Sequence, residues 1–169
     1  MKLMQLVVAV VISMTALASH AAFLPNMTAV QIRTEIAAQL AAQSPAGSDL
    51  NAVARSAAGA GLNMASFVTA LMGMPGVTPA QAVRAAVLAQ PTSAVAIAEA
   101  AAKADPDSAA TIARTAAGAA PSYADAIADA VALIVPAAAN AIYAQVQIAV
   151  PAATLTPISG QVTCGASCS

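Results

Sequence analysis

Five prolines recur at one fixed spacing through the second half of the chain, each 15 residues from the next: Pro91, Pro106, Pro121, Pro136 and Pro151. A proline inside an α-helix costs about 3 kcal/mol, because it removes a hydrogen bond and its ring clashes with the preceding turn. At the first helical position the same residue is harmless, since that backbone N–H has no helical partner. The spacing therefore excludes one long helix. It predicts a series of short helices of about 10–12 residues, each followed by a tight turn.

The residues between the prolines keep a fixed helical register. Counted from each proline as zero, position +8 is charged in three of the four segments, as Glu99, Arg114 and Asp129. Positions +3, +6, +7 and +10 are apolar apart from one tyrosine, and they fall on one stripe of a helix. Position +6 is always isoleucine, which predicts a repeat core made of Ile97, Ile112, Ile127 and Ile142.

The same register extends upstream, with a glycine in place of the proline. Units that begin at Gly47, Gly61 and Gly76 follow the same positions, so about seven units cover residues 47–150. Self-similarity at a short fixed period is typical of stacked repeat architectures. The predicted fold class is therefore all-α: an array of short antiparallel helices with a 15-residue repeat, arranged as a helical-hairpin solenoid or a compact bundle.

Polar residues that favour helix starts stand where several helices should begin. Asp105 directly precedes a repeat proline and fits an N-cap. Thr78 with Gln81 has the spacing of a capping box, and so has Thr28 with Gln31. The last pair predicts one amphipathic helix ahead of the repeats.

The first 21 residues have the composition of a secretory signal peptide. Lys2 precedes an apolar run, and small residues at Ser19 and Ala21 suit a cleavage site. A membrane anchor is the alternative, but the apolar run of 15 residues, 3–17, falls short of the roughly 20 that span a bilayer. We therefore expect cleavage near Ala21 and a periplasmic or extracellular location. The predicted organisation is a signal peptide (1–21), an N-terminal segment with one amphipathic helix (22–46), alanine-rich helical repeats (47–150) and an uncharged C-terminal tail (151–169).

Two cysteines, Cys164 and Cys168, lie close together in this tail. In an oxidising compartment such a pair favours a disulfide. The bridge could form within one chain or between two chains, and a metal clip completed by ligands from elsewhere is a third interpretation. A lone pair of cysteines at this spacing is weak evidence for a metal site.

Charged and catalytic residue types are scarce, which excludes several classes of function. Six lysines and arginines against seven acids form no basic surface for nucleic acid. His20 is the only histidine and would leave with the signal peptide, so serine and cysteine triads and histidine metal sites are excluded. Asp125 with Asp129, and Asp105 with Asp107, are better explained as a solvated helix face and an N-cap than as acid–base pairs. The sequence thus predicts no enzyme, no cofactor and no metal site.

No charged residue follows Asp129, so the segment 130–169 is uncharged. In the last two units the expected outward positions are also apolar, and a helix that is apolar on all sides is buried in protein or in lipid. Three interpretations remain open for this segment: the centre of the fold, a self-association face, or a surface that enters or lies on a membrane. The candidate assembly surface consists of Leu133, Ile134, Val135, Ile148 and Val150.

Alanine makes up 51 of the 169 residues, and a buried alanine removes little apolar area from water. A core of this kind offsets conformational entropy poorly, so apolar surface is expected to be shared between chains. The sequence predicts an exported structural or interaction protein without enzymatic activity that acts through self-assembly or partner binding, its expected partner being itself in a homo-oligomer. The alternative is a membrane-associated or membrane-active protein that uses segment 130–153.

Overall fold

The computed structural model describes residues 22–43 and 49–153. The expected signal peptide, 1–21, lies outside the described residues. Cys164 and Cys168 also lie outside them, so the disulfide stays a prediction.

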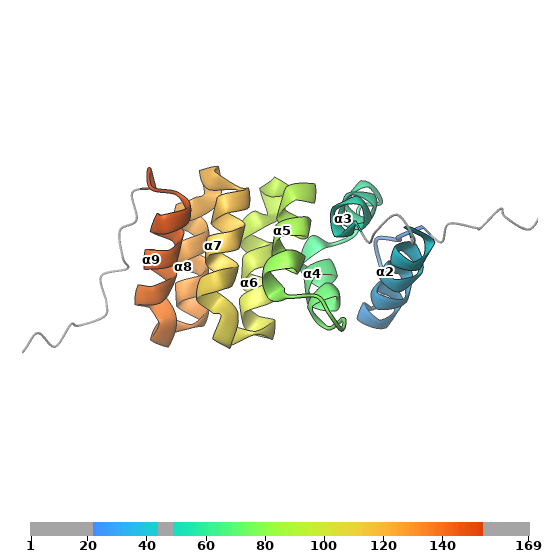
Figure 1. Cartoon of the computed structure of the whole chain (residues 1–169), viewed down its shortest axis with the longest axis horizontal. Coiled ribbons are helices and arrows are strands. Elements are labelled where there is room, and N and C mark those ends of the chain that lie inside the picture. The colour runs from blue at the N-terminus through green and yellow to red at the C-terminus, as the bar shows by residue number, and fades with distance from the viewer. Residues whose placement is uncertain (1–21, 44–48, 154–169) are drawn as a thin grey trace, which may run out of the picture.

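The fold is all-α, as the sequence predicts, and the described residues contain no strand. Within the described residues, eight α-helices pack against each other (Figure 1). They are α2 (Ala29–Gln43), α3 (Leu50–Gly59), α4 (Met64–Met72), α5 (Pro79–Ala89), α6 (Ala94–Ala104), α7 (Ala109–Ala119), α8 (Ala124–Ile134) and α9 (Ala139–Ala149). Helices α3–α9 correspond to the seven repeat units, and α2 is the helix expected ahead of them.

The repeat prolines end one helix and start the next. Residues that precede a proline are pushed out of the helical region of backbone space, and Asp105 before Pro106 accordingly has φ −142° and ψ 83°. Pro106 then opens a three-residue 3-10 turn, and α7 follows with 11 residues. The same turn precedes α6, α8 and α9, so in these units the proline starts the turn and not the α-helix itself. Asp105 caps that turn by accepting a hydrogen bond from the backbone N–H of Ser108 at 3.3 Å.

The upstream units start differently, because their prolines are displaced or missing. Gly61 and Gly76 adopt φ of 73° and 81° in the connections before α4 and α5, a region that glycine tolerates better than other residues. Helix α5 begins at Pro79 with the expected capping box: Gln81 Oε1 accepts from the Thr78 N–H at 3.0 Å, and Thr78 Oγ1 accepts from the Gln81 N–H at 3.3 Å.

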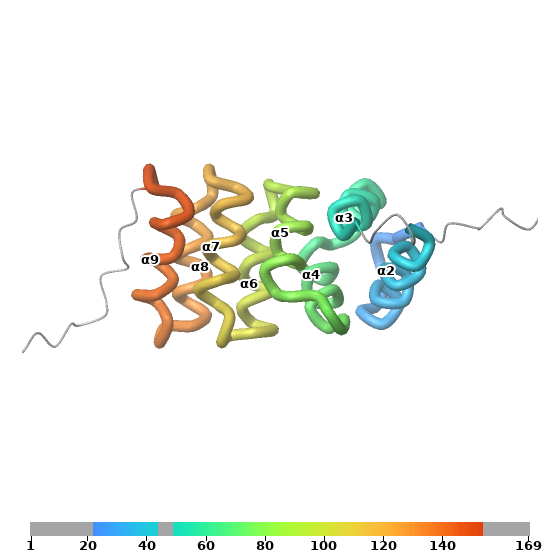
Figure 2. Tube along the Cα trace, in the orientation of Figure 1, coloured from blue at the N-terminus to red at the C-terminus, as the bar shows by residue number. Residues whose placement is uncertain are grey.

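The helices form two layers, because each helix packs against the helices two positions away as well as against its direct neighbours. We call α3, α5, α7 and α9 the odd layer, and α2, α4, α6 and α8 the even layer. In Figure 1, α5, α7 and α9 lie nearer the viewer, with α6 and α8 behind them. The trace in Figure 2 shows the chain passing back and forth between the layers. The arrangement is a solenoid of stacked helical hairpins.

The core runs between the layers along the whole solenoid. The isoleucines at position +6 are fully buried, and most of the apolar stripe around them is buried as well. Alanine occupies most of the neighbouring buried positions, and small side chains let helix axes approach towards the short end of the roughly 8–10 Å packing range. The isoleucines are Ile97, Ile112, Ile127 and Ile142, each with an exposed fraction of 0%.

Candidate interaction surface

The structure separates the five residues of the expected assembly surface. Leu133 is 75% exposed and Ile148 is 65% exposed. Ile134, Val135 and Val150 are only partly buried and pack against the core. These three lie where α8 and α9 end and the chain turns, so their side chains cover the end of the core. The expectation that all five face outward is therefore corrected to two of them.

Leu133 and Ile148 also lie on different layers. Both occupy position +12 of their units, which points away from the core, but α8 belongs to the even layer and α9 to the odd layer. No single apolar patch contains both side chains. Within residues 130–153, the uncharged segment therefore contributes one large exposed hydrophobic residue to each layer.

Ile148 forms one wall of an open groove in the odd layer. The groove crosses α5, α7 and α9 and has a volume of about 480 Å³. Leu88 of α5, itself 46% exposed, forms the opposite wall. Among the groove residues are Arg84, Leu88, Arg114, Gly118, Ile148 and Ala149.

Gly118 opens the groove over α7. At position +12 the other units from α5 onward carry the larger residues Leu88, Lys103, Leu133 and Ile148. Gly118 lies inside α7, and Gly61 and Gly76 are the glycines with positive φ among those in the described part of the chain. A Cβ atom built at Gly118 would meet only the Ala149 Cβ at 3.8 Å, an ordinary van der Waals contact. Neither backbone conformation nor core packing requires glycine here, although glycine destabilises a helix interior relative to alanine.

Gly118→Ala should therefore raise the free energy of unfolding by about 0.5–1 kcal/mol, because the helix gains propensity and no atom has to move. Urea denaturation measures the difference. Gly61→Ala is the matched control and should lower the free energy of unfolding, because φ at Gly61 is 73° and alanine is strained there. A loss of stability in Gly118→Ala would mean that the space beside Ala149 is closed.

The odd layer is basic. At position +8 three of its four helices carry an arginine, Arg55, Arg84 or Arg114, and no acidic residue lies within α3, α5, α7 or α9. In the even layer, α8 carries two acids and no base, Asp125 and Asp129, both exposed. Successive units alternate between layers, so charges that alternate along the sequence are separated in space.

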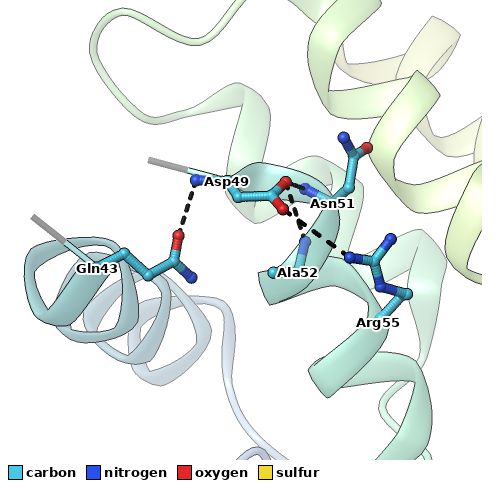
Figure 3. Close-up of polar contacts among 5 residues, drawn as sticks. All are labelled: Gln43, Asp49, Asn51, Ala52 and Arg55. Atoms are coloured by element: carbon cyan, nitrogen blue, oxygen red, sulfur yellow. Dashed lines mark hydrogen bonds and ion pairs between the residues drawn. The ribbon is translucent and has the colours of Figure 1, made fainter. Parts of the chain in front are cut away.

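Of the three arginines, Arg55 is the least available to bind an acidic partner. Asp49 caps α3, accepting hydrogen bonds from the backbone N–H groups of Asn51 at 2.9 Å and Ala52 at 3.2 Å (Figure 3). Its second carboxylate oxygen lies 3.9 Å from Arg55 Nη2. The Asp49 N–H donates to Gln43 Oε1 at 2.7 Å, which ties the start of α3 to the end of α2. Arg55 thus has a local counter-charge.

Arg84 and Arg114 are exposed and form no ion pair with any residue that the structure describes. In the even layer, Glu99 is paired with Lys103 at 3.5 Å within α6. Asp129 accepts a hydrogen bond from the Tyr143 hydroxyl at 2.8 Å. That contact fixes the Asp129 carboxylate but does not neutralise its charge.

Sequence reasoning missed the groove and the separation of charge between the layers. The separation of charge does have a signal in the sequence, because position +8 alternates between arginine and acid from Arg84 to Asp129. Sequence reasoning also missed Glu35, a carboxylate only 5% exposed in α2, which accepts a hydrogen bond from Gln39 Nε2 at 2.8 Å. Glu35 lies far from the groove in the chain and contributes to the packing of α2.

Across residues 22–43 and 49–153, no three His, Cys, Asp or Glu side chains come together as ligands for a metal ion. None of the helices in the described part of the chain is long and apolar enough to cross a bilayer. No protein-family model, curated protein or solved structure matches this chain. Inference about function therefore depends on the surface itself.

Proposed function

We propose that the chain is an exported interaction protein without enzymatic activity, which acts by self-association, and that the groove over α7 is its binding surface. The groove carries this proposal, because it combines two apolar walls, Leu88 and Ile148, with two arginines that have no ion-pair partner among the described residues.

Both features are typical of protein interfaces. Arginine is enriched at interfaces, and burying large exposed apolar side chains against a partner stabilises the complex. Solenoids present extended surfaces of this kind for binding. The proposal of export depends on residues 1–21, whose sequence pattern is typical of a signal peptide.

A membrane-associated role is the alternative, and the arrangement of the exposed hydrophobic residues favours a protein partner. Leu133 and Ile148 lie on different layers, so a flat lipid surface would contact one of them and leave the other in water. Helices that lie in a membrane interface concentrate their apolar residues on one face.

Sedimentation velocity across a wide range of concentrations tests the proposal. We expect the sedimentation coefficient of the protein to rise with concentration, in the presence and absence of reductant. A monomer at every concentration would contradict self-association. Co-sedimentation with phosphatidylglycerol vesicles by a chain that stays monomeric in solution would favour the membrane alternative instead.

A further inference from the structure

We infer that the groove over α7 receives helix α8 of a second copy of this chain. In this contact Leu133 of the second copy occupies the space above Gly118, and Asp129 of that copy faces Arg114. The inference rests on the proposed self-association and names the two surfaces that meet.

Charge is the first ground for choosing α8. The groove presents Arg84 and Arg114 without an ion-pair partner among the residues described. Asp125 and Asp129 are exposed on α8, a helix without a basic residue. The remaining acid within α4, α6 and α8 is Glu99, which is only partly exposed and already paired with Lys103. Among α4, α6 and α8, helix α8 is therefore the acidic surface that is free to meet the groove; the exposed Asp107 lies in the turn before α7 and not on an even-layer helix.

Register is the second ground. Arg114 and Gly118 occupy positions +8 and +12 of α7, and Asp129 and Leu133 occupy the same two positions of α8. Each pair is separated by four residues, a rise of about 6 Å along a helix. When the second copy's α8 lies parallel to α7, its Asp129 lies level with Arg114. One helical turn further on, its Leu133 lies level with Gly118, where α7 has no side chain.

Apolar burial is the third ground. Leu88, Leu133 and Ile148 are three of the five large hydrophobic residues that the described chain leaves exposed, at 46%, 75% and 65%. The proposed contact places the Leu133 side chain between the other two, in the volume of about 480 Å³ that the groove provides. One contact thus removes all three from water.

The geometry also determines the kind of assembly. The groove belongs to the odd layer and α8 to the even layer, so each copy keeps a free α8 when its groove is filled, and a free groove when its α8 is bound. Such a head-to-tail contact continues from copy to copy and gives an open filament, unless the rotation between copies closes a ring.

A charge exchange between two chains tests the pairing. Full-length Arg114→Asp and full-length Asp129→Arg should each associate at least tenfold more weakly than the unchanged chain, because like charges would meet. An equimolar mixture should recover association, since the groove of the first variant then meets the α8 of the second with opposite charges, and the remaining groove and α8 are unchanged. Sedimentation velocity gives the association state, and circular dichroism checks that each chain is folded.

Two further variants keep the test decisive if a charge reversal disturbs the fold. Asp129→Asn removes the charge but keeps an oxygen that can accept from the Tyr143 hydroxyl, and it should still weaken association. Gly118→Leu fills the groove, where a Cβ has room, and should abolish association. Gly59→Leu is the matched control: a Cβ there meets nothing within 4 Å, it lies outside the groove, and it should associate normally.

The outcomes separate this inference from the proposed function. Association that persists in Gly118→Leu and Arg114→Asp would overturn the inference and leave self-association standing on another surface. A mixture that fails to recover would overturn the pairing of Arg114 with Asp129. An unchanged chain that never associates would overturn both proposals, and an oligomer lost on reduction would assign assembly to the cysteines and overturn the inference.

Discussion

Ile112→Asp should lower the free energy of unfolding by about 3–5 kcal/mol, because it places a carboxylate without a counter-charge in the core. Ile112 is 0% exposed, and α7 packs against α5, α6, α8 and α9, so the new side chain cannot reach water without separating the layers. Domains are stable by only about 5–15 kcal/mol. Urea denaturation followed by circular dichroism should show a large fall in the midpoint or an unfolded chain.

Arg114→Ala is the matched control, two residues further along the same helix. Arg114 is exposed and has no ion-pair partner among the residues that the structure describes, so its removal should change stability by no more than about 0.5 kcal/mol. Both variants are measured at a concentration where the chain is monomeric. Equal losses in the two variants would mean that the repeat register does not describe the core.

The fold follows from the sequence because two local rules act together at each repeat boundary. A proline restricts the residue before it and cannot continue a helix, so Asp105 and Pro106 mark a boundary that no tertiary contact has to specify. The stripe containing Ile112 then decides which side of the helix faces the core. The 3-10 turn that opens four of the units was not predicted, because proline suits the first position of either kind of helix.

The groove could not be predicted from one repeat, because it is built from three helices that are two units apart. Leu88, Gly118 and Ile148 become neighbours only once the units alternate between layers. The expectation that Ile134 and Val135 face outward was wrong for a related reason. The pattern of a single helix predicts which stripe faces the core, but not how the following turn packs the end of the helix against the core. Alternation between layers is a tertiary property, and the 15-residue period alone does not reveal it.

Phe67→Ala should lower the free energy of unfolding by about 3–5 kcal/mol, the usual cost of truncating a buried phenylalanine. Phe67 is the largest fully buried side chain in the described residues. Its ring lies 6.0 Å from the ring of Phe23, edge to face at 82°.

The loss should be uneven along the chain, because each helix of a solenoid contacts only its near neighbours. Helix α2 packs mainly against α4, so Phe67→Ala should accelerate amide hydrogen exchange in α2 far more than in α8. Leu24→Ala is the control, since Leu24 is 62% exposed and its removal should cost no more than about 0.5 kcal/mol. Equal loss of protection in α2 and α8 would show that the array unfolds as a single unit. Cooperative unfolding of that kind would require the alanine-lined contacts between neighbouring helices to transmit the loss through all the units between α4 and α8.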